Sequence, residues 1–165
     1  TDGKLLMCEP DEIREIAGPP IASREISQAK YVSDIRRMVA EVAESAGMDE
    51  SSIHCFVLCA GEATTNAIKH AGAGTASIHK VDDGLLFMIS DKGRGIAAIN
   101  LPEVALKKGY TTAISLGLGY KAMISTADQV YLATGPGGTT VGIEMKLHPE
   151  PILSLLASLP DTWVD

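Results

Sequence analysis

The stretch Glu62-Ala63-Thr64-Thr65-Asn66-Ala67-Ile68-Lys69-His70-Ala71-Gly72 says more about the fold than any other part of the 165-residue chain. Four polar side chains recur in it at spacing i, i+4, i+7 and i+8: Glu62, Asn66, Lys69 and His70. One face of a helix presents all four. Turning them inward on an apolar helix is costly unless they bind something. The spacing predicts a ligand site, and the alternative is a solvated helix end with chance polar residues.

These side chains have chemical roles that fit a bound nucleotide. Asn66 offers a hard amide oxygen to Mg²⁺, which usually keeps waters and binds substrate phosphates. Lys69 offers a point charge to a phosphate group. Glu62 can act as the base for a hydroxyl or a water. The helix face is therefore predicted to carry the metal and phosphate end of an ATP site.

Two further clusters follow in a fixed order. Asp91-Lys92-Gly93-Arg94-Gly95-Ile96 comes directly after an apolar run. A carboxylate there can accept from the adenine amino group, and glycines let a ligand approach the backbone. Leu116-Gly117-Leu118-Gly119-Tyr120 can present free N–H groups to an anion at a helix start. It lacks the Lys-Ser/Thr of a P-loop and the third glycine of a dinucleotide fingerprint.

Hydrophobic periodicity and turn signals predict an α+β fold. Gly, Pro and polar residues from Lys92 to Leu116 predict a lid that orders over the ligand. Expected helices cover 26–47, 49–71 and 117–127, and expected strands cover 75–81, 85–90, 129–134 and 139–147. The pattern corresponds to a two-layer α/β sandwich, a mixed and mostly antiparallel sheet with helices on one face.

The flanks fall outside this pattern. Residues 1–20 are expected to form an N-terminal extension with a short helix around Ile13 and Ile16, and 21–148 the domain itself. Residues 149–165 carry an apolar stripe typical of a tail helix, which either packs on the domain or binds a partner.

Composition narrows the functional classes. A length of 165 residues suits one domain with a real core, and a net charge of −7 argues against nucleic acid as a partner. The sequence has no run of about 18 apolar residues that would predict a membrane span. Three cysteines are an odd number and predict no disulfide framework, which favours a cytoplasmic location. Cys55 and Cys59 fit two core residues better than a metal or redox pair.

Taken together, the clusters resemble the motifs of GHKL-type (Bergerat-fold) ATPase domains. Glu62-x-x-x-Asn66-x-x-Lys69-His70 resembles the N box and Asp91-x-Gly93-x-Gly95 the G1 box. Gly117-x-Gly119 with Gly138-Thr139-Thr140 resembles the G2 region. Within the superfamily, the chain is most similar to anti-sigma-factor serine kinases and the stressosome switch kinase. The resemblance runs from about Ser23 to Leu147.

The resemblance implies a kinase that uses ATP and Mg²⁺ to phosphorylate serine or threonine on a STAS-domain antagonist. Asp91 would read adenine with Thr140 and Thr139, Asn66 would hold Mg²⁺ and Glu62 would activate the acceptor hydroxyl. A sigma factor or a PP2C-type phosphatase is the second partner that it implies, for a monomer or homodimer acting away from membranes. The implied ATP-binding residues are Asn66, Lys69, His70, Asp91, Gly93, Gly95, Ile96, Gly117, Leu118, Gly119, Tyr120, Thr139 and Thr140.

The chain also departs from the family pattern. Many sigma-binding members carry a lid arginine where this chain has Ser115 and Leu116, and Arg94 stands where proline is frequent. The first departure makes direct sigma-factor binding a weaker expectation. Two alternatives stay open: the catalytic domain of a sensor histidine kinase, which lacks a preceding phosphoacceptor helix here, and a non-catalytic module that binds partners when ATP is bound.

Overall fold

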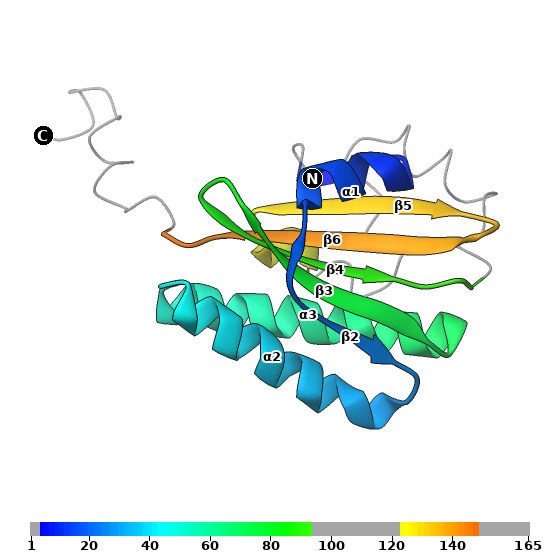
Figure 1. Cartoon of the computed structure of the whole chain (residues 1–165), viewed down its shortest axis with the longest axis horizontal. Helices are drawn as coiled ribbons and strands as arrows, with labels where there is room; N and C mark the ends of the chain where they lie inside the picture. Colours follow the sequence, from blue (N-terminus) through cyan, green and yellow to red (C-terminus); the bar gives the residue numbers. More distant parts are fainter. Residues whose placement is uncertain (1–3, 94–122, 149–165) are drawn as a thin grey trace, which may run out of the picture.

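The computed structural model describes residues 4–93 and 123–148, which form one mixed six-stranded sheet with flanking helices (Figure 1). The strand order in the sheet is β1-β5-β6-β4-β3-β2. The elements are β1 (Leu5–Met7), α1 (Pro10–Ala17), β2 (Pro20–Ile26), the 3₁₀ turn η1 (Ala29–Tyr31), α2 (Val32–Ser45), α3 (Glu50–Ala71), β3 (Gly74–Val81), β4 (Gly84–Ser90), β5 (Gln129–Gly135) and β6 (Gly138–Lys146).

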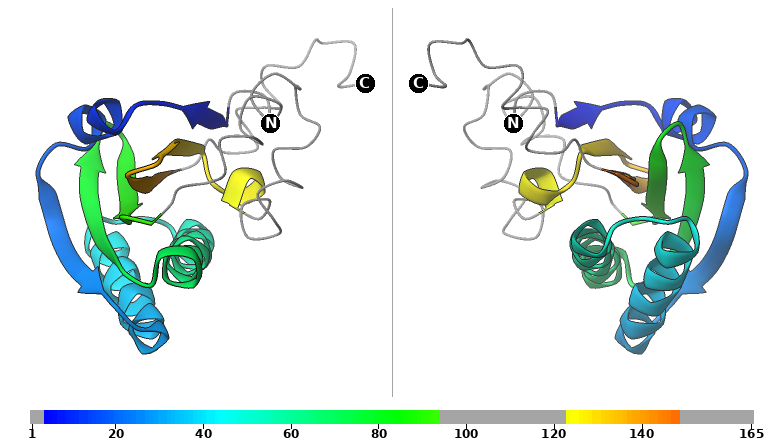
Figure 2. Two further views of the ribbon diagram at one scale, coloured as in Figure 1. Left: turned by 90° about the vertical axis from the view of Figure 1, so that its right-hand side faces the viewer. Right: turned by 90° about the vertical axis from the view of Figure 1, so that its left-hand side faces the viewer.

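Helices α2 and α3 form one layer against the sheet (Figures 1 and 2). In α2 the residues at spacing i, i+4 and i+8, namely Ile35, Val39 and Ala43, are fully buried. Helix α3 begins where the Asp49 carboxylate accepts from the Ser52 amide at 3.1 Å, and it ends at Gly72 with a left-handed φ of 79°. No helix in the described residues is both long and apolar enough to span a membrane.

Both predicted hairpins are confirmed. Strands β3 and β4 join through Asp82 and Asp83, and strands β5 and β6 join through Pro136 and Gly137. Strand β4 lies between β3 and β6. Its position in the middle of the sheet buries five of its seven residues, so the polar residue that follows it stands at the end of a rigid element.

The expected first helix was placed too early in the chain. Residues 20–26 form strand β2, which pairs antiparallel with β3 alone, and the α-helix begins only at Val32 after the turn η1. An edge strand tolerates Pro20, because proline has no N–H to donate and a residue at the edge does not need to donate to a neighbouring strand. The sequence signal for this strand was the alternation of Glu25 and Ile26, of which Ile26 faces the core and Glu25 the other side of the sheet.

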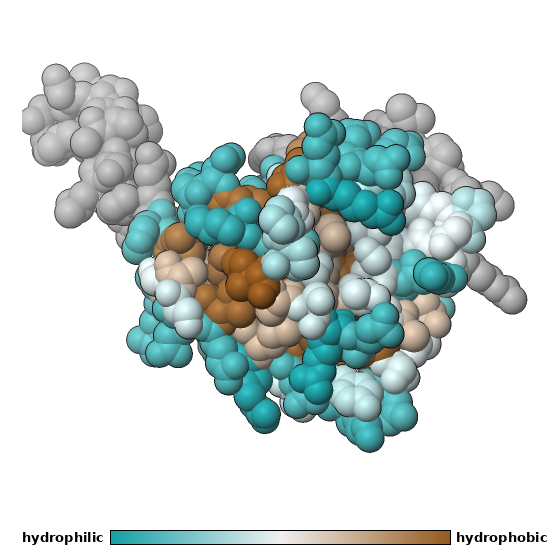
Figure 3. All heavy atoms as spheres, viewed as in Figure 1, coloured by the Kyte–Doolittle hydropathy of each residue, from teal (hydrophilic) through white to brown (hydrophobic). Residues whose placement is uncertain are grey.

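The confirmed α+β sandwich carries one element on the face opposite α2 and α3. Helix α1 buries Ile13 and Ala17 there, against Leu86, Tyr131 and their neighbours. The surface over α1 is hydrophilic, and the hydrophobic patch visible in this view lies away from it (Figure 3). Residues 5–17, which the sequence placed in an extension, thus pack on the sheet, and β1 pairs parallel with β5.

A buried histidine fastens the end of α1 to the sheet. His79 on β3 is 3% exposed, and its Nδ1 lies 3.0 Å from the Gly18 carbonyl oxygen. Because a carbonyl can only accept, Nδ1 carries the proton and donates, and Nε2 shares a hydrogen bond of 2.8 Å with the Ser77 hydroxyl. Both ring nitrogens are satisfied, so the imidazole serves as a structural clamp between α1 and β3.

Candidate nucleotide-binding site

Asp91 is held in place by backbone groups at the end of β4. Its Oδ1 accepts from the Gly93 amide at 2.9 Å and from the Thr139 amide at 3.2 Å. Its own amide donates to the Thr139 carbonyl at 2.8 Å. Among the described residues these bonds to the carboxylate all use Oδ1, so Oδ2 keeps its capacity to accept from a ligand. The arrangement gives a half-buried carboxylate with a fixed direction.

Two glycines allow three segments of the chain to meet around this carboxylate. A Cβ built on Gly93 would lie 2.7 Å from the Cβ of Ala71, the last residue of α3. A Cβ on Gly138 would collide with the Asp91 carbonyl oxygen and lie 3.0 Å from the Cα of Lys92. The end of α3, the end of β4 and the β5–β6 turn therefore touch through positions where no side chain fits.

Substitution of Gly138 by alanine is expected to destabilise the protein by about 1–3 kcal/mol, because the residue combines a φ of 137° with contact against the Asp91 backbone. Gly137→Ala is the matched control: its Cβ would meet nothing within 4 Å, so a change within about 0.5 kcal/mol is expected. Urea unfolding of both variants measures the difference. Equal midpoints for the two would show that the close approach at Gly138 is unimportant.

The structure separates the two threonines that were expected to act together. Because successive strand residues face opposite sides, Thr139 and Thr140 cannot both face the same ligand. The Thr139 hydroxyl lies 2.8 Å from that of Thr134, and the Thr139 backbone bonds Asp91. The Thr140 hydroxyl instead lies 2.9 Å from Ser90 on the face that carries α1. Thr139 is therefore the better placed partner of Asp91, and the sequence order alone did not show this.

The polar face of α3 is less uniform than the spacing suggested. Glu62 and Asn66 are half-buried, whereas Lys69 and His70 are exposed, so the expectation that all four point inward is wrong for the last two. The buried stripe of α3 runs nearby through Ala60, Ala63, Thr64 and Ala67.

The helix sets out a direction along which a ligand could extend. At a rise of about 1.5 Å per residue, Asn66 lies roughly 7–8 Å along the axis from Ala71, and Glu62 lies roughly 13–14 Å from it. Ala71 contacts Gly93 beside Asp91. A ligand that starts at Asp91 and follows α3 therefore meets Asn66 first and Glu62 next.

A short helical piece, residues 123–126, packs beside α3 near Glu62. The Cys59 thiol lies 3.0 Å from the Thr126 hydroxyl, and Met123 is fully buried. Burial raises the pKa of the Cys59 thiol, and the negative charge of Glu62 raises this pKa further. Glu62 stands three positions after Cys59, so both lie on the same side of α3. Cys59 and the half-buried Cys55 contribute to the core, as the sequence suggested.

Several predicted site residues lie outside the described residues. They are Gly95, Ile96, Gly117, Leu118, Gly119 and Tyr120, together with most of the expected lid from Lys92 to Leu116. Sequence reasoning also missed Ala71, which contacts Gly93, and Thr134, which holds the Thr139 hydroxyl. Ala71 has no polar side chain although it stands in the first cluster, and Thr134 lies outside the clusters, so only their three-dimensional contacts reveal these roles.

Comparisons with known proteins agree with this geometry. The sequence model of the histidine kinase-like ATPase domain matches residues 27–145. No curated protein matches the sequence. The fold is similar to the crystal structure of the RsbU and RsbW domains of Rv1364c from Mycobacterium tuberculosis, with a TM-score of 0.56, 18% identity and coverage of 79% of this chain. The match spans 34% of the mycobacterial chain, about a third of its length.

A second similar structure is the SiaB–SiaC complex from Pseudomonas aeruginosa, with a TM-score of 0.59 and 11% identity, covering 82% of this chain and 94% of that chain. At these identities the two structures support the fold, while the sequence model covers most of the chain, including α3, Asp91 and the β5–β6 turn. The chain belongs to the histidine kinase-like ATPase domain family.

Proposed function

We propose that this domain binds Mg-ATP and transfers the γ-phosphoryl group to a serine or threonine of a STAS-domain antagonist protein. The observation that carries the proposal is the Asp91 carboxylate, anchored through Oδ1 by the Gly93 and Thr139 amides. An adenine amino group is a donor of the kind that the remaining oxygen, Oδ2, can accept. Fixing the carboxylate beforehand removes the cost of ordering it when the base binds.

The phosphate end of the ligand is assigned to α3. Asn66 supplies an amide oxygen at the half-buried edge of the helix, and Lys69 supplies an exposed ammonium group about one turn closer to Ala71. No group of three or more His, Cys, Asp or Glu side chains capable of holding a metal occurs among residues 4–93 and 123–148. The single amide oxygen of Asn66 fits Mg²⁺, which takes one or two protein oxygens and otherwise binds phosphates and water. Once bound, the ion would neutralise phosphate charge.

The acceptor side of the reaction is assigned to Glu62. Glu62 lies one helical turn beyond Asn66 on α3, in the direction that leads away from Asp91. A half-buried carboxylate at that end can take the proton of an incoming hydroxyl as the phosphoryl group arrives. A protein partner is supported by the similar structure from Pseudomonas aeruginosa, in which SiaB is in complex with SiaC. A sigma factor or a PP2C-type phosphatase is proposed as the second, regulatory partner.

The test of nucleotide binding is the substitution Asp91→Asn. The amide oxygen can still accept from Gly93 and Thr139, but the charge is lost and the other atom becomes a donor facing the adenine amino group. We expect ATP affinity to fall about tenfold or more, the scale of one charge-assisted hydrogen bond. Calorimetric titration of the folded variant with Mg-ATP measures this.

Asp83→Asn is the matched control, because Asp83 is exposed in the β3–β4 turn at the other end of the strand. Its ATP affinity should equal that of the parent protein. Unchanged affinity in Asp91→Asn, with the fold retained, would remove Asp91 from the site and with it the basis of the proposal.

A further inference from the structure

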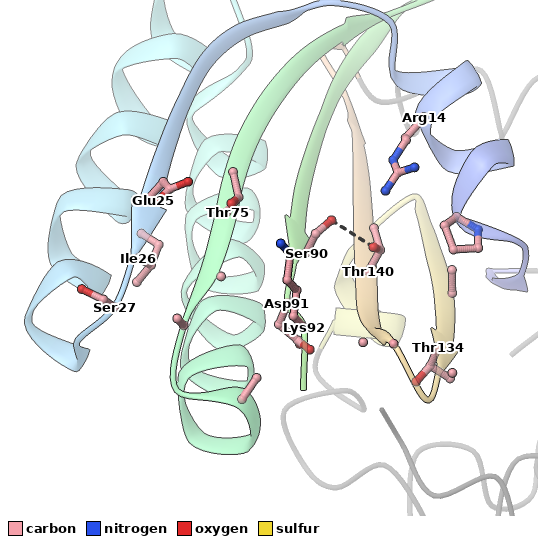
Figure 4. A pocket seen from close by; sticks show the side chains of 18 of the residues that line it. Arg14, Glu25, Ile26, Ser27, Thr75, Ser90, Asp91, Lys92, Thr134 and Thr140 are labelled. Carbon is pink, nitrogen blue, oxygen red and sulfur yellow. Dashed lines mark hydrogen bonds between the residues drawn. The ribbon is translucent and has the colours of Figure 1, made fainter. Parts of the chain in front are cut away.

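A cavity of about 720 Å³ lies beside the ends of β4 and β6, opens onto the face of the sheet that carries α1, and reaches Ala71 at the end of α3. Helix α1 forms one wall through Glu9, Pro10 and Arg14, and the β5–β6 turn forms another (Figure 4). Its volume falls within the range of about 300–1,000 Å³ that is typical of ligand sites. Neither Glu62 nor Asn66 lines it. The cavity is therefore distinct from the phosphate end of the proposed ATP site, although Ala71, Asp91 and Gly138 border both.

The floor of the cavity is a row of polar side chains set by strand register. Glu25 pairs with Thr75, Thr75 with Ser90, and Ser90 with Thr140, so four adjacent strands contribute one residue each. All four residues line the cavity. Ser90 and Thr140 share a hydrogen bond of 2.9 Å, and each hydroxyl keeps further capacity to donate or accept. The row offers hydrogen bonds to a polar backbone laid across the strands.

Charges of opposite sign stand at the two ends of this row. Glu25 lies on the outermost of these strands, and Arg14 reaches from α1 toward the side of Thr140 (Figure 4). Among the described residues, Arg14 forms one ion pair, to Asp11 at 3.3 Å. Because this pair is exposed, Arg14 can leave it for a charged group of a ligand at little cost in free energy. Glu9, Asp91 and Lys92 complete the charged lining, giving three acids and two bases. This balance disfavours a polyanion and suits a ligand that carries both signs.

We propose that the cavity binds a short extended peptide segment of a partner protein, with a basic side chain at Glu25 and an acidic side chain at Arg14. Three strand spacings of about 4.8 Å separate β2 from β6, so the floor is roughly 14 Å wide. Four extended residues span about 13 Å, which matches this width. The hydroxyl row supplies partners for the peptide amides, and the two terminal charges fix the direction of the segment.

The probe for this proposal is the tetrapeptide Lys-Gly-Gly-Asp, blocked at both termini and titrated without nucleotide into the ¹⁵N-labelled protein. We expect amide shifts at Arg14, Thr75, Ser90 and Thr140, and affinity at least about fivefold lower in the variant Arg14→Glu. In that variant, the blocked peptide Lys-Gly-Gly-Lys should bind at least about fivefold more tightly than Lys-Gly-Gly-Asp. A purely structural role of Arg14 would not produce this exchange of preference.

Arg37→Glu is the control, since Arg37 is exposed on α2 in the other layer and should leave both affinities unchanged. Absence of shifts at millimolar peptide, or equal binding of the neutral peptide Gln-Gly-Gly-Gln to the parent protein, would overturn the proposal. Shifts confined to residues outside the cavity would do the same. Because the titration contains no ATP, its outcome is independent of whether the proposed kinase activity is correct.

Discussion

Replacing Asn66 by alanine is expected to abolish the Mg²⁺-dependent part of ATP binding while the protein stays folded. The amide oxygen is the metal ligand proposed for this helix, and alanine leaves the ion with phosphates and water alone. Alanine is the best helix former and removes only a half-buried side chain at the edge of the core, so α3 should persist. Titration of ATP with Mg²⁺ and with EDTA separates the metal-dependent binding from the rest.

Thr65→Ala provides the control for this experiment. Thr65 is the neighbouring residue on α3, is exposed, and bonds only the Gly61 carbonyl at 2.8 Å among the described residues. The control should retain the full difference between the Mg²⁺ and EDTA titrations. If Asn66→Ala retained that difference as well, the assignment of the metal end of the ligand to this face of α3 would be wrong.

The elements with strong local signals could be read from the sequence. Two hairpins follow from Asp82-Asp83-Gly84 and from the glycine-rich turn after Thr134, and both appear in the sheet. The end of α3 follows from Gly72, which adopts the left-handed conformation that such a stop requires. Asp91 was placed at the end of a strand because the apolar run from Leu85 to Ile89, followed by Ser90, precedes it. In each case, residues close in sequence carry the information.

The features that sequence reasoning missed depend on contacts between distant residues. Strand β1 pairs with β5 across more than 120 positions, and its three residues have no pattern that favours a strand over an extension. The register of β6 against β4 decides that Thr140 meets Ser90, whereas Thr139 meets Asp91. Shifting that register by one residue would exchange their roles. Local periodicity cannot fix such a choice.

The glycines show how local and distant constraints combine at the site. Gly93 was assigned to ligand approach, and the structure shows that its missing side chain also accommodates Ala71 at the end of α3. Gly138 similarly makes room for the backbone of Asp91. The adenine carboxylate proposed here is consequently positioned by packing between three elements. Its direction is a property of the whole fold, which explains why the short Asp-x-Gly pattern is common yet rarely forms a nucleotide site.

The substitution Glu62→Gln is expected to lower phosphoryl transfer to a STAS-domain partner by about 10²–10⁴-fold, the usual contribution of a general base. The neutral amide keeps the shape of the side chain but cannot take the proton of the acceptor hydroxyl. ATP binding should change little, because Glu62 lies roughly 13–14 Å along α3 from the end that contacts Gly93 beside Asp91. Single-turnover phosphorylation with saturating Mg-ATP isolates the chemical step.

The control for this loss is Glu50→Gln, an exposed carboxylate in the first turn of the same helix, whose rate should match that of the parent. A Glu62→Gln rate within about threefold of the parent would exclude the base role. The domain would then be better described as a module that binds its partners in an ATP-dependent way without phosphorylating them.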